Sequence, residues 1–120
     1  MRKTLTAAAI VVSAMLQGCA TTNALYSWGP YENQIYEHFK GESPEKQIQI
    51  LEQHAQVAKS KGQKLPPGFS AHLGLLYGKV GRDDAFIAAL EEEKANFPES
   101  APYINNLLKK SRQGDANAKK

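Results

Sequence analysis

The sequence predicts an all-α protein built from about five helices. Apolar residues recur at spacings of three and four positions in several successive segments, which is the period of a helix with one buried face. Glycine, proline and serine stand between these segments, where helices typically end and begin. No segment alternates apolar and polar residues for long enough to indicate a strand. With 120 residues, 42% hydrophobic and 22% charged, the chain has the size and composition of one folded domain.

Residues 1–18 have the organisation of a cleaved secretory signal peptide. Arg2 and Lys3 precede a mainly apolar run that extends from Leu5 to Leu16. A helix of twelve residues rises about 18 Å, whereas the hydrocarbon core of a bilayer is roughly 30 Å thick. The run is therefore too short for a stable transmembrane span.

The only cysteine of the chain, Cys19, follows this run. The segment Leu16-Gln17-Gly18-Cys19 resembles the bacterial lipobox, in which the signal is cut before a cysteine that carries diacylglycerol. The resemblance implies a mature protein with acyl chains on the sulfur and amine of Cys19, and residues 19–30 as lipidated N-terminus and tether. In bacterial lipoproteins an aspartate after the cysteine commonly signals inner-membrane retention, so Ala20 favours the periplasmic face of the outer membrane. The alternative is a structural cysteine buried in a helix.

The first helix is expected between Tyr31 and Gly41. Its inward-facing residues have spacings of four, one and three: Tyr31, Ile35, Tyr36 and Phe39. The second helix begins at Ser43 and Pro44, an N-cap followed by a proline at the first helical position, and ends at Gly62. Its apolar stripe has spacings of three, four and three: Ile48, Leu51, Ala55 and Ala58.

The third and fourth helices are expected to form a hairpin around Gly81. The third carries five apolar residues: Phe69, Leu73, Leu76, Tyr77 and Val80. The fourth begins at Arg82 or Asp83, ends at Pro98, and carries Ala85, Phe86, Ala89, Leu90 and Phe97. Ser100 is expected to cap a fifth helix, whose inward-facing residues are Ile104, Leu107 and Leu108. We therefore place the helical domain at residues 31–111 and a flexible basic tail at residues 112–120.

The hairpin contains five residues at the spacing of the tetratricopeptide repeat: Leu73, Gly74, Tyr77, Gly81 and Pro98. The resemblance implies a short tetratricopeptide-like stack of helical hairpins. In such a stack Gly74 lets two helices approach closely, and Tyr77 fills the groove between them. The repeat prefers a small alanine where this chain has Phe86, so the register of the fourth helix stays open.

Aromatic residues are concentrated next to the tether, since five of the ten in the chain lie between positions 26 and 39. Either they pack along the N-terminal helix and close the core, or they form a patch that contacts a partner or lies near the membrane. On the second interpretation the candidate partner-binding residues are Trp28, Tyr31 and Tyr36.

The sequence contains no motif of a catalytic or metal-binding site. His38, His54 and His72 fall in three different expected helices, outside any H-E-x-x-H motif. The run Glu91-Glu92-Glu93 spreads around a helix and is expected to be solvated. A lone cysteine allows neither a disulfide nor a thiolate metal cluster. We therefore expect no enzymatic activity, cofactor or metal, although a carboxylate pair assembled from distant positions stays open.

The charge distribution argues against a nucleic-acid partner. From Cys19 onward the chain has 13 basic and 12 acidic side chains, so the mature protein is almost neutral. A protein that contacts several phosphates needs a much stronger basic bias.

Three segments after the lipobox resemble a family of small Gram-negative outer-membrane lipoproteins of unknown function: YSWGPYENQIYEHFK, KLPPGFSAHLGLLYGKVG and EEEKANFPES. The resemblance extends from Tyr26 to Leu108. Members are commonly encoded beside a lipoprotein similar to the curli export channel and another small lipoprotein. This implies that those two lipoproteins are partners in an outer-membrane assembly or secretion complex.

We therefore expect a non-catalytic accessory or adaptor subunit, held at the outer membrane through Cys19 and facing the periplasm. The alternative is a stand-alone periplasmic protein, namely a ligand-binding protein, a holdase or an enzyme with an unrecognised site. A deep polar pocket with convergent titratable groups would favour that alternative.

Overall fold

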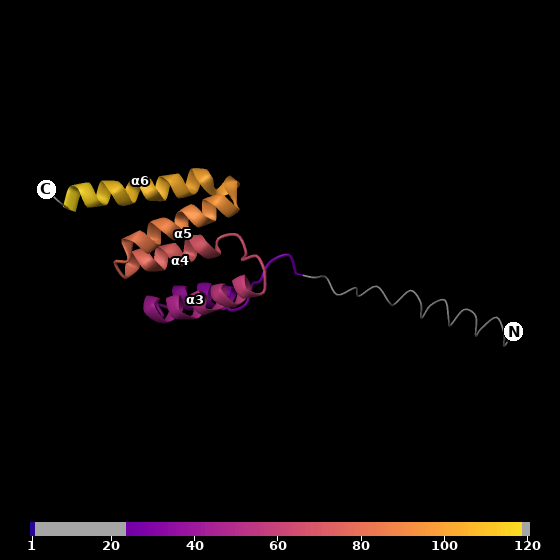
Figure 1. The fold of residues 1–120 in the computed structure, drawn as a ribbon. Coiled ribbons are helices and arrows are strands. Elements are labelled where there is room, and N and C mark those ends of the chain that lie inside the picture. Colours follow the sequence, from indigo (N-terminus) through magenta and orange to yellow (C-terminus); the bar gives the residue numbers. More distant parts are fainter. Residues whose placement is uncertain (2–23, 119–120) are drawn as a thin grey trace.

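A computed structural model describes residue 1 and residues 24–118 of the chain. The described residues are helical with connecting loops and contain no strand, which confirms the predicted all-α class. Figure 1 shows the five α-helices and one short 3-10 helix: α2 Tyr31–Phe39, α3 Pro44–Ser60, α4 Phe69–Lys79, α5 Asp83–Asn96, η1 Pro98–Ser100 and α6 Ala101–Ala118. Cys19 and the expected signal peptide lie outside the described residues. Of the helices in residues 24–118, none is long and apolar enough to cross a bilayer.

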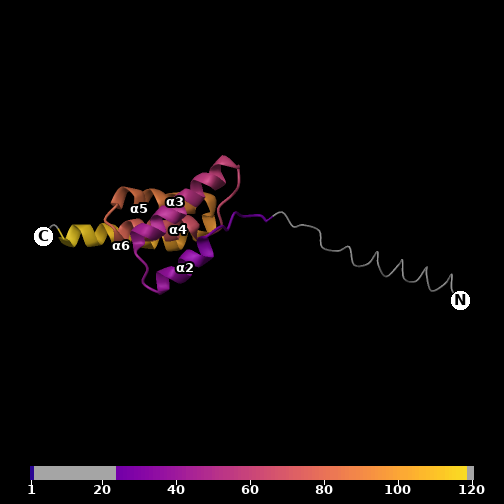
Figure 2. The same ribbon diagram turned by 90° about the horizontal axis from the view of Figure 1, so that it is seen from below.

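The helices stack in the order of the chain. Helices α3, α4, α5 and α6 follow one another across the molecule, and each packs against the next (Figure 1). The most extensive contact joins α4 and α5, the hairpin around Gly81. Helix α2 packs on α3 and lies at the edge of the stack (Figure 2). The core therefore runs through the centre of the stack, and its least exposed large side chains come from four helices: Leu51, Phe69, Leu76, Leu90 and Ile104.

The structure confirms the local chemistry predicted for the start of α3 and for the α4–α5 turn. The expected cap at Ser100 is wrong, because Ser100 lies in η1 and its hydroxyl donates a hydrogen bond of 2.7 Å to the Phe97 carbonyl. The Ser43 hydroxyl accepts a hydrogen bond of 3.3 Å from the backbone N–H of Lys46, and Pro44 occupies the first turn of α3. Gly81, with a φ of +75°, makes the turn between α4 and α5. A side chain there would meet no atom within 4 Å, so backbone conformation rather than space favours glycine.

The hairpin uses Gly74 as its spacing implied, whereas the hydroxyl of Tyr77 reaches α3. A Cβ at Gly74 would lie 3.3 Å from the Cβ of Ala89 and 3.3 Å from Cδ2 of Leu90, so α4 and α5 approach closely there. Tyr77 is buried in the core, and its hydroxyl donates a hydrogen bond of 2.7 Å to Glu52 on α3. Burial and this carboxylate raise the pKa of Tyr77 to about 12.

Phe86 fits the hairpin because α4 carries a glycine opposite it. Phe86 is buried, and its ring lies against Gly78, where an added Cβ would come 3.3 Å from Phe86 Cδ2. The missing side chain of Gly78 thus makes room for the large residue where the repeat pattern prefers alanine. The register of α5 is settled with Phe86, Ala89 and Leu90 all inward.

The inward face of α2 differs from the predicted one. Tyr31 is half-buried and Gln34 is 4% exposed, whereas Tyr36 is 60% and Phe39 is 83% exposed. The prediction that Tyr36 and Phe39 face inward is wrong. Compared with the predicted orientation, α2 is rotated about its axis by about one residue. Ring contacts of Tyr31 with Phe69 and of His38 with His72 on α4 fix this orientation.

Two other expectations also need correction. Glu93 is 3% exposed, so the run Glu91-Glu92-Glu93 is not uniformly solvated. Helix α6 continues to Ala118, beyond the boundary expected at residue 111, and extends past the start of α5 (Figure 1). Gly114 keeps a negative φ, and the surrounding alanine, lysine, arginine and glutamine residues favour helix, so no local signal ends α6 earlier.

Candidate functional site

The segment before α2, residues 24–30, lies against the helical stack, and we call it the strap. The backbone N–H of Ser27 donates a hydrogen bond of 2.7 Å to the carbonyl of Lys64 in the α3–α4 loop. The Ser27 carbonyl lies 2.9 Å from Nε2 of His54 on α3. Because a carbonyl only accepts, Nε2 of His54 carries the proton of this bond. The strap is therefore held to both α3 and the loop that follows it.

His54 and Gly29 form a close contact within the same attachment. Gly29 has a φ of +46°, and a Cβ added to it would overlap the imidazole of His54. The imidazole also packs on Phe69, with ring centroids 5.9 Å apart. His54 thus connects the strap to the core. The sequence showed no signal for this role, because Ser27 and His54 are 27 positions apart.

Trp28 and Tyr31, two of the predicted partner-binding residues, lie together at the start of α2. Their rings stack with centroids 6.2 Å apart and planes 27° from parallel. Tyr31 also contacts Phe69, with centroids 5.3 Å apart, and so joins Trp28 to the core. Burial, and then the negative charge of Glu93, raise the pKa of the Tyr31 phenol. Trp28 remains 42% exposed.

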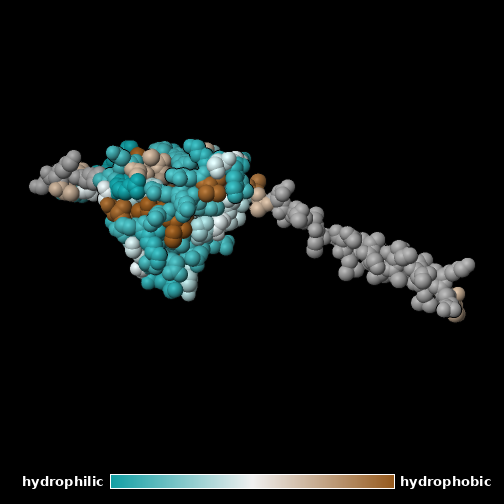
Figure 3. All heavy atoms as spheres, turned by 60° about the horizontal axis from the view of Figure 1, so that its bottom comes forward, coloured by the Kyte–Doolittle hydropathy of each residue, from teal (hydrophilic) through white to brown (hydrophobic). Residues whose placement is uncertain are grey.

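Tyr36, the third predicted residue, lies apart from this pair. Its ring has the ammonium of Lys40 at 4.9 Å from the centroid, and among the described residues it has no aromatic partner. Phe39 follows on the same outward side of α2 and is 83% exposed. We refer to Trp28, Tyr36 and Phe39 as the exposed aromatic residues. Figure 3 shows one face of the molecule on which apolar residues form separate small patches in a mainly hydrophilic surface.

Two histidines meet where α2 packs against the core, His38 from α2 and His72 from α4. His38 and His72 meet edge to face with centroids 5.0 Å apart, and Tyr31 approaches His72 at 6.1 Å. His72 is 8% exposed, and its Nε2 has no hydrogen-bond partner. Burial, followed by the positive charges of His38 and Lys79, lowers the pKa of His72 to about 4. Within residues 24–118, no three histidine, cysteine or acidic residues are grouped so that they could hold a metal ion.

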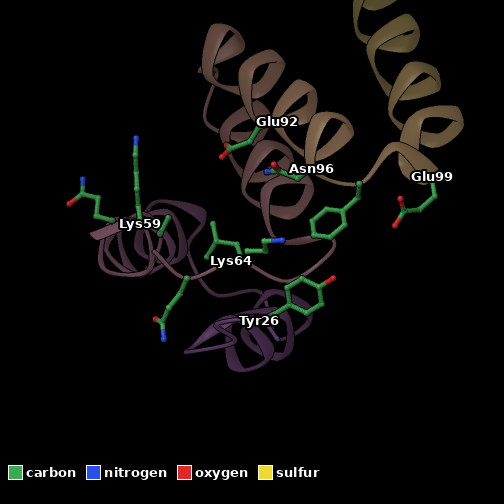
Figure 4. Close-up of a pocket in the computed structure, with 11 residues that line it drawn as sticks. Tyr26, Lys59, Lys64, Glu92, Asn96 and Glu99 are labelled. Atoms are coloured by element: carbon green, nitrogen blue, oxygen red, sulfur yellow. The ribbon is translucent and has the colours of Figure 1, made fainter. Parts of the chain in front are cut away.

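A cavity of about 630 Å³ lies between α3 and the C-terminal end of α5. Tyr26 of the strap lines it and packs edge to face on Phe97, with centroids 5.9 Å apart. Figure 4 shows Lys59 on the α3 side and Glu92, Asn96 and Glu99 on the opposite side, with Tyr26 and Lys64 between them. The sequence did not predict this cavity, because its walls come from segments far apart in the chain.

The sequence from residue 25 to residue 107 matches a protein family described as a domain of unknown function, DUF4810. The chain belongs to the DUF4810 family. The matched region begins in the strap and ends within α6, so it includes the exposed aromatic residues and the cavity. No curated protein and no solved structure matches this DUF4810 chain. The description assigns the family no activity, so functional inference depends on the surfaces described above.

Proposed function

We propose that this protein is a non-catalytic, lipid-anchored accessory or adaptor subunit of an outer-membrane assembly or secretion complex. The observation that carries the proposal is the position of the exposed aromatic residues Trp28, Tyr36 and Phe39. Trp28 lies in the strap, where the chain that carries the proposed lipid anchor joins the folded domain, and Tyr36 and Phe39 lie on the helix that follows. Large, rigid aromatic side chains that are partly exposed are typical anchors of protein–protein contacts.

The proposed anchor would keep these residues close to the membrane. Ser27, which is bound to the stack, lies eight positions after Cys19. A fully extended chain of that length spans at most about 29 Å. A lipidated Cys19 would therefore hold Ser27 within that distance of the bilayer surface. A membrane protein or another lipoprotein can reach a surface at this height.

The sequence resemblance names the partner that we propose, a larger lipoprotein similar to the curli export channel, together with another small lipoprotein. A small adaptor suits the exposed aromatic residues, because three partly exposed side chains form a small contact surface rather than a continuous apolar face. Trp28 is the central residue of this contact, since its stack on Tyr31 fixes the indole in one orientation before binding.

Affinity purification from cross-linked cells, in mild detergent and with Cys19 intact, tests the proposal. We expect wild-type protein to recover the larger lipoprotein in stoichiometric amount. Trp28→Glu and Phe39→Glu should each reduce recovery by about tenfold or more, because a buried unpaired charge opposes association. Tyr103→Glu is the matched control, since Tyr103 is 57% exposed on α6, far from the strap in sequence.

Each outcome of this experiment has a definite meaning. Unchanged recovery with both variants would show that the exposed aromatic residues do not bind the partner. Recovery of the wild-type protein alone would contradict the adaptor function. Mass spectrometry of the purified N-terminus tests the anchor separately, and an unmodified Cys19 would contradict lipidation.

A further inference from the structure

The cavity between α3 and α5 has the dimensions of a ligand site. Its volume of about 630 Å³ falls within the range of roughly 300–1,000 Å³ that is common for ligand pockets. Three parts of the chain build it: α3 with the loop after it, the end of α5 with η1, and Tyr26 of the strap. None of the exposed aromatic residues of the proposed docking surface lines it. The cavity is thus a separate feature of the molecule.

Charged residues of both signs line this cavity. Lys59 and Lys64 come from α3 and its following loop, whereas Glu92 and Glu99 come from α5 and η1 (Figure 4). Within the described part of the chain, none of these four side chains forms an ion pair or a hydrogen bond. Other exposed charges do pair, as Lys94 does with Glu91 and Arg82 with Glu52. The lining of the cavity therefore contains two cations and two anions that are not paired with each other.

The remaining lining supplies groups suited to a peptide backbone and an apolar side chain. Gln56, Gln63 and Asn96 line the cavity, and their carboxamides form no hydrogen bonds within residues 24–118. A carboxamide offers both a donor and an acceptor, as a peptide group does. Tyr26 and Phe97, packed edge to face, provide the aromatic surface against which an apolar side chain can lie.

We propose that this cavity binds a short extended peptide that carries an acidic and a basic side chain on either side of an apolar one. The acidic side chain pairs with Lys64 or Lys59, and the basic one pairs with Glu92 or Glu99. The carboxamides bind the peptide backbone, and the apolar side chain packs on the aromatic pair. A nucleotide fits less well, because the two glutamates repel its phosphates, and a neutral sugar would leave all four charges unpaired.

The strap completes this site. Tyr26 precedes Ser27, whose N–H is bound to the carbonyl of Lys64, so one contact positions an aromatic residue and a lysine of the cavity together. The peptide is consequently expected to bind only when the strap is attached to the stack. Loss of that attachment removes part of the aromatic surface.

Fluorescence anisotropy with the full chain in mild detergent tests the proposal. The probes are labelled pentapeptides of sequence EAFAK and KAFAE, and the control peptide is QAFAQ. We expect at least one charged peptide to bind with a dissociation constant of about 1 mM or tighter, and more tightly than the neutral control. Lys64→Ala and Glu92→Ala should each weaken that binding by about twofold to fivefold, as for partly exposed ion pairs.

Tyr26→Ala should weaken binding of all three peptides, because it removes the aromatic contact instead of a charge. Lys110→Ala, an exposed lysine of α6 outside the cavity, is the matched control and should leave binding unchanged. Circular dichroism verifies that each variant keeps its helix content. The proposal would be overturned by equal binding of charged and neutral peptides, by the absence of binding, or by preferential binding of a neutral disaccharide such as chitobiose.

Discussion

The side chain of Glu93 caps helix α4 from the neighbouring helix, since its Oε1 accepts a hydrogen bond of 2.6 Å from the backbone N–H of Gly68. Its Oε2 accepts a second hydrogen bond, of 3.3 Å, from the N–H of Ala71. Gly68 is the N-cap residue of α4 and has no side chain of its own for this purpose. The carboxylate also places negative charge at the positive end of the helix dipole. One buried residue of α5 thus replaces a local cap.

Removing this cap should destabilise the fold. We expect Glu93→Gln to lower the free energy of unfolding by about 1–2 kcal/mol, and Glu93→Ala by about 2–3 kcal/mol, because the donors of Gly68 and Ala71 lose an acceptor. Urea denaturation followed by circular dichroism measures the change. The neighbouring exposed Glu92→Gln is the control and should change stability little. Equal stability of Glu93→Ala and wild type would show that the cap contributes nothing.

Acidification should weaken the packing of α2 through His72. Its pKa is lowered from 6.5 to about 4 in the folded protein, so the unfolded chain binds the proton more readily. The stability that depends on neutral His72 is complete above a pH of about 6.5 and is lost as the pH falls towards 4.

The difference between wild type and His72→Leu isolates this effect from the other titrating groups. Because Nε2 of His72 has no partner, leucine removes the ionisation without leaving a donor unpaired. Unfolding of both proteins in urea across this pH range measures it. A wild-type curve parallel to that of His72→Leu would contradict the prediction.

Substitution of Gly29 should detach the strap. In Gly29→Ala the new methyl group overlaps the ring of His54, and the φ of +46° disfavours any side chain. Trp28, the only tryptophan of the chain, reports the change, and its fluorescence should become more accessible to acrylamide.

Gly114→Ala is the matched control for this substitution. A Cβ there meets no atom within 4 Å, and the φ of Gly114 is not positive, so the alanine should raise stability by about 0.5–1 kcal/mol. Unchanged quenching of Trp28 in Gly29→Ala would mean that the strap can shift to accept the methyl group.

Phe86 and Gly78 should be energetically coupled. Phe86→Ala is expected to cost about 3–5 kcal/mol through the cavity that it leaves. Gly78→Ala adds a methyl group 3.3 Å from the ring of Phe86. This tight contact should offset the stability that alanine gains over glycine from its higher helix propensity. In the Phe86→Ala background, Gly78→Ala should stabilise the protein, because the methyl group at position 78 then enters the space that the Phe86 ring has left.

A double-mutant cycle in urea measures this coupling, which we expect to be about 0.5–2 kcal/mol. Additive effects of Gly78→Ala and Phe86→Ala would show that the two residues do not compensate for each other. Gly114→Ala combined with Phe86→Ala provides the additive reference, since Gly114 has no neighbouring side chain.

Local signals in the sequence were sufficient to predict the helices and several of their ends. Ser43 and Pro44 begin α3 and Gly81 turns the hairpin where they were expected, because caps and turns act within a few residues of the chain. The close approach at Gly74 was also foreseeable, since only a missing side chain permits it.

The sequence by itself therefore determined the fold class, the order of the helices and most of their ends. Only the tertiary structure decided which residues of each helix are buried and which are exposed. Helix α2 buries Gln34 and exposes Phe39, and α5 buries Glu93, because contacts with distant partners outweigh the polarity of a single side chain. The cavity depends on tertiary structure in the same way, since Tyr26, Lys64 and Phe97 meet only when the strap, a loop and α5 pack together. Such contacts leave no periodic pattern in the sequence.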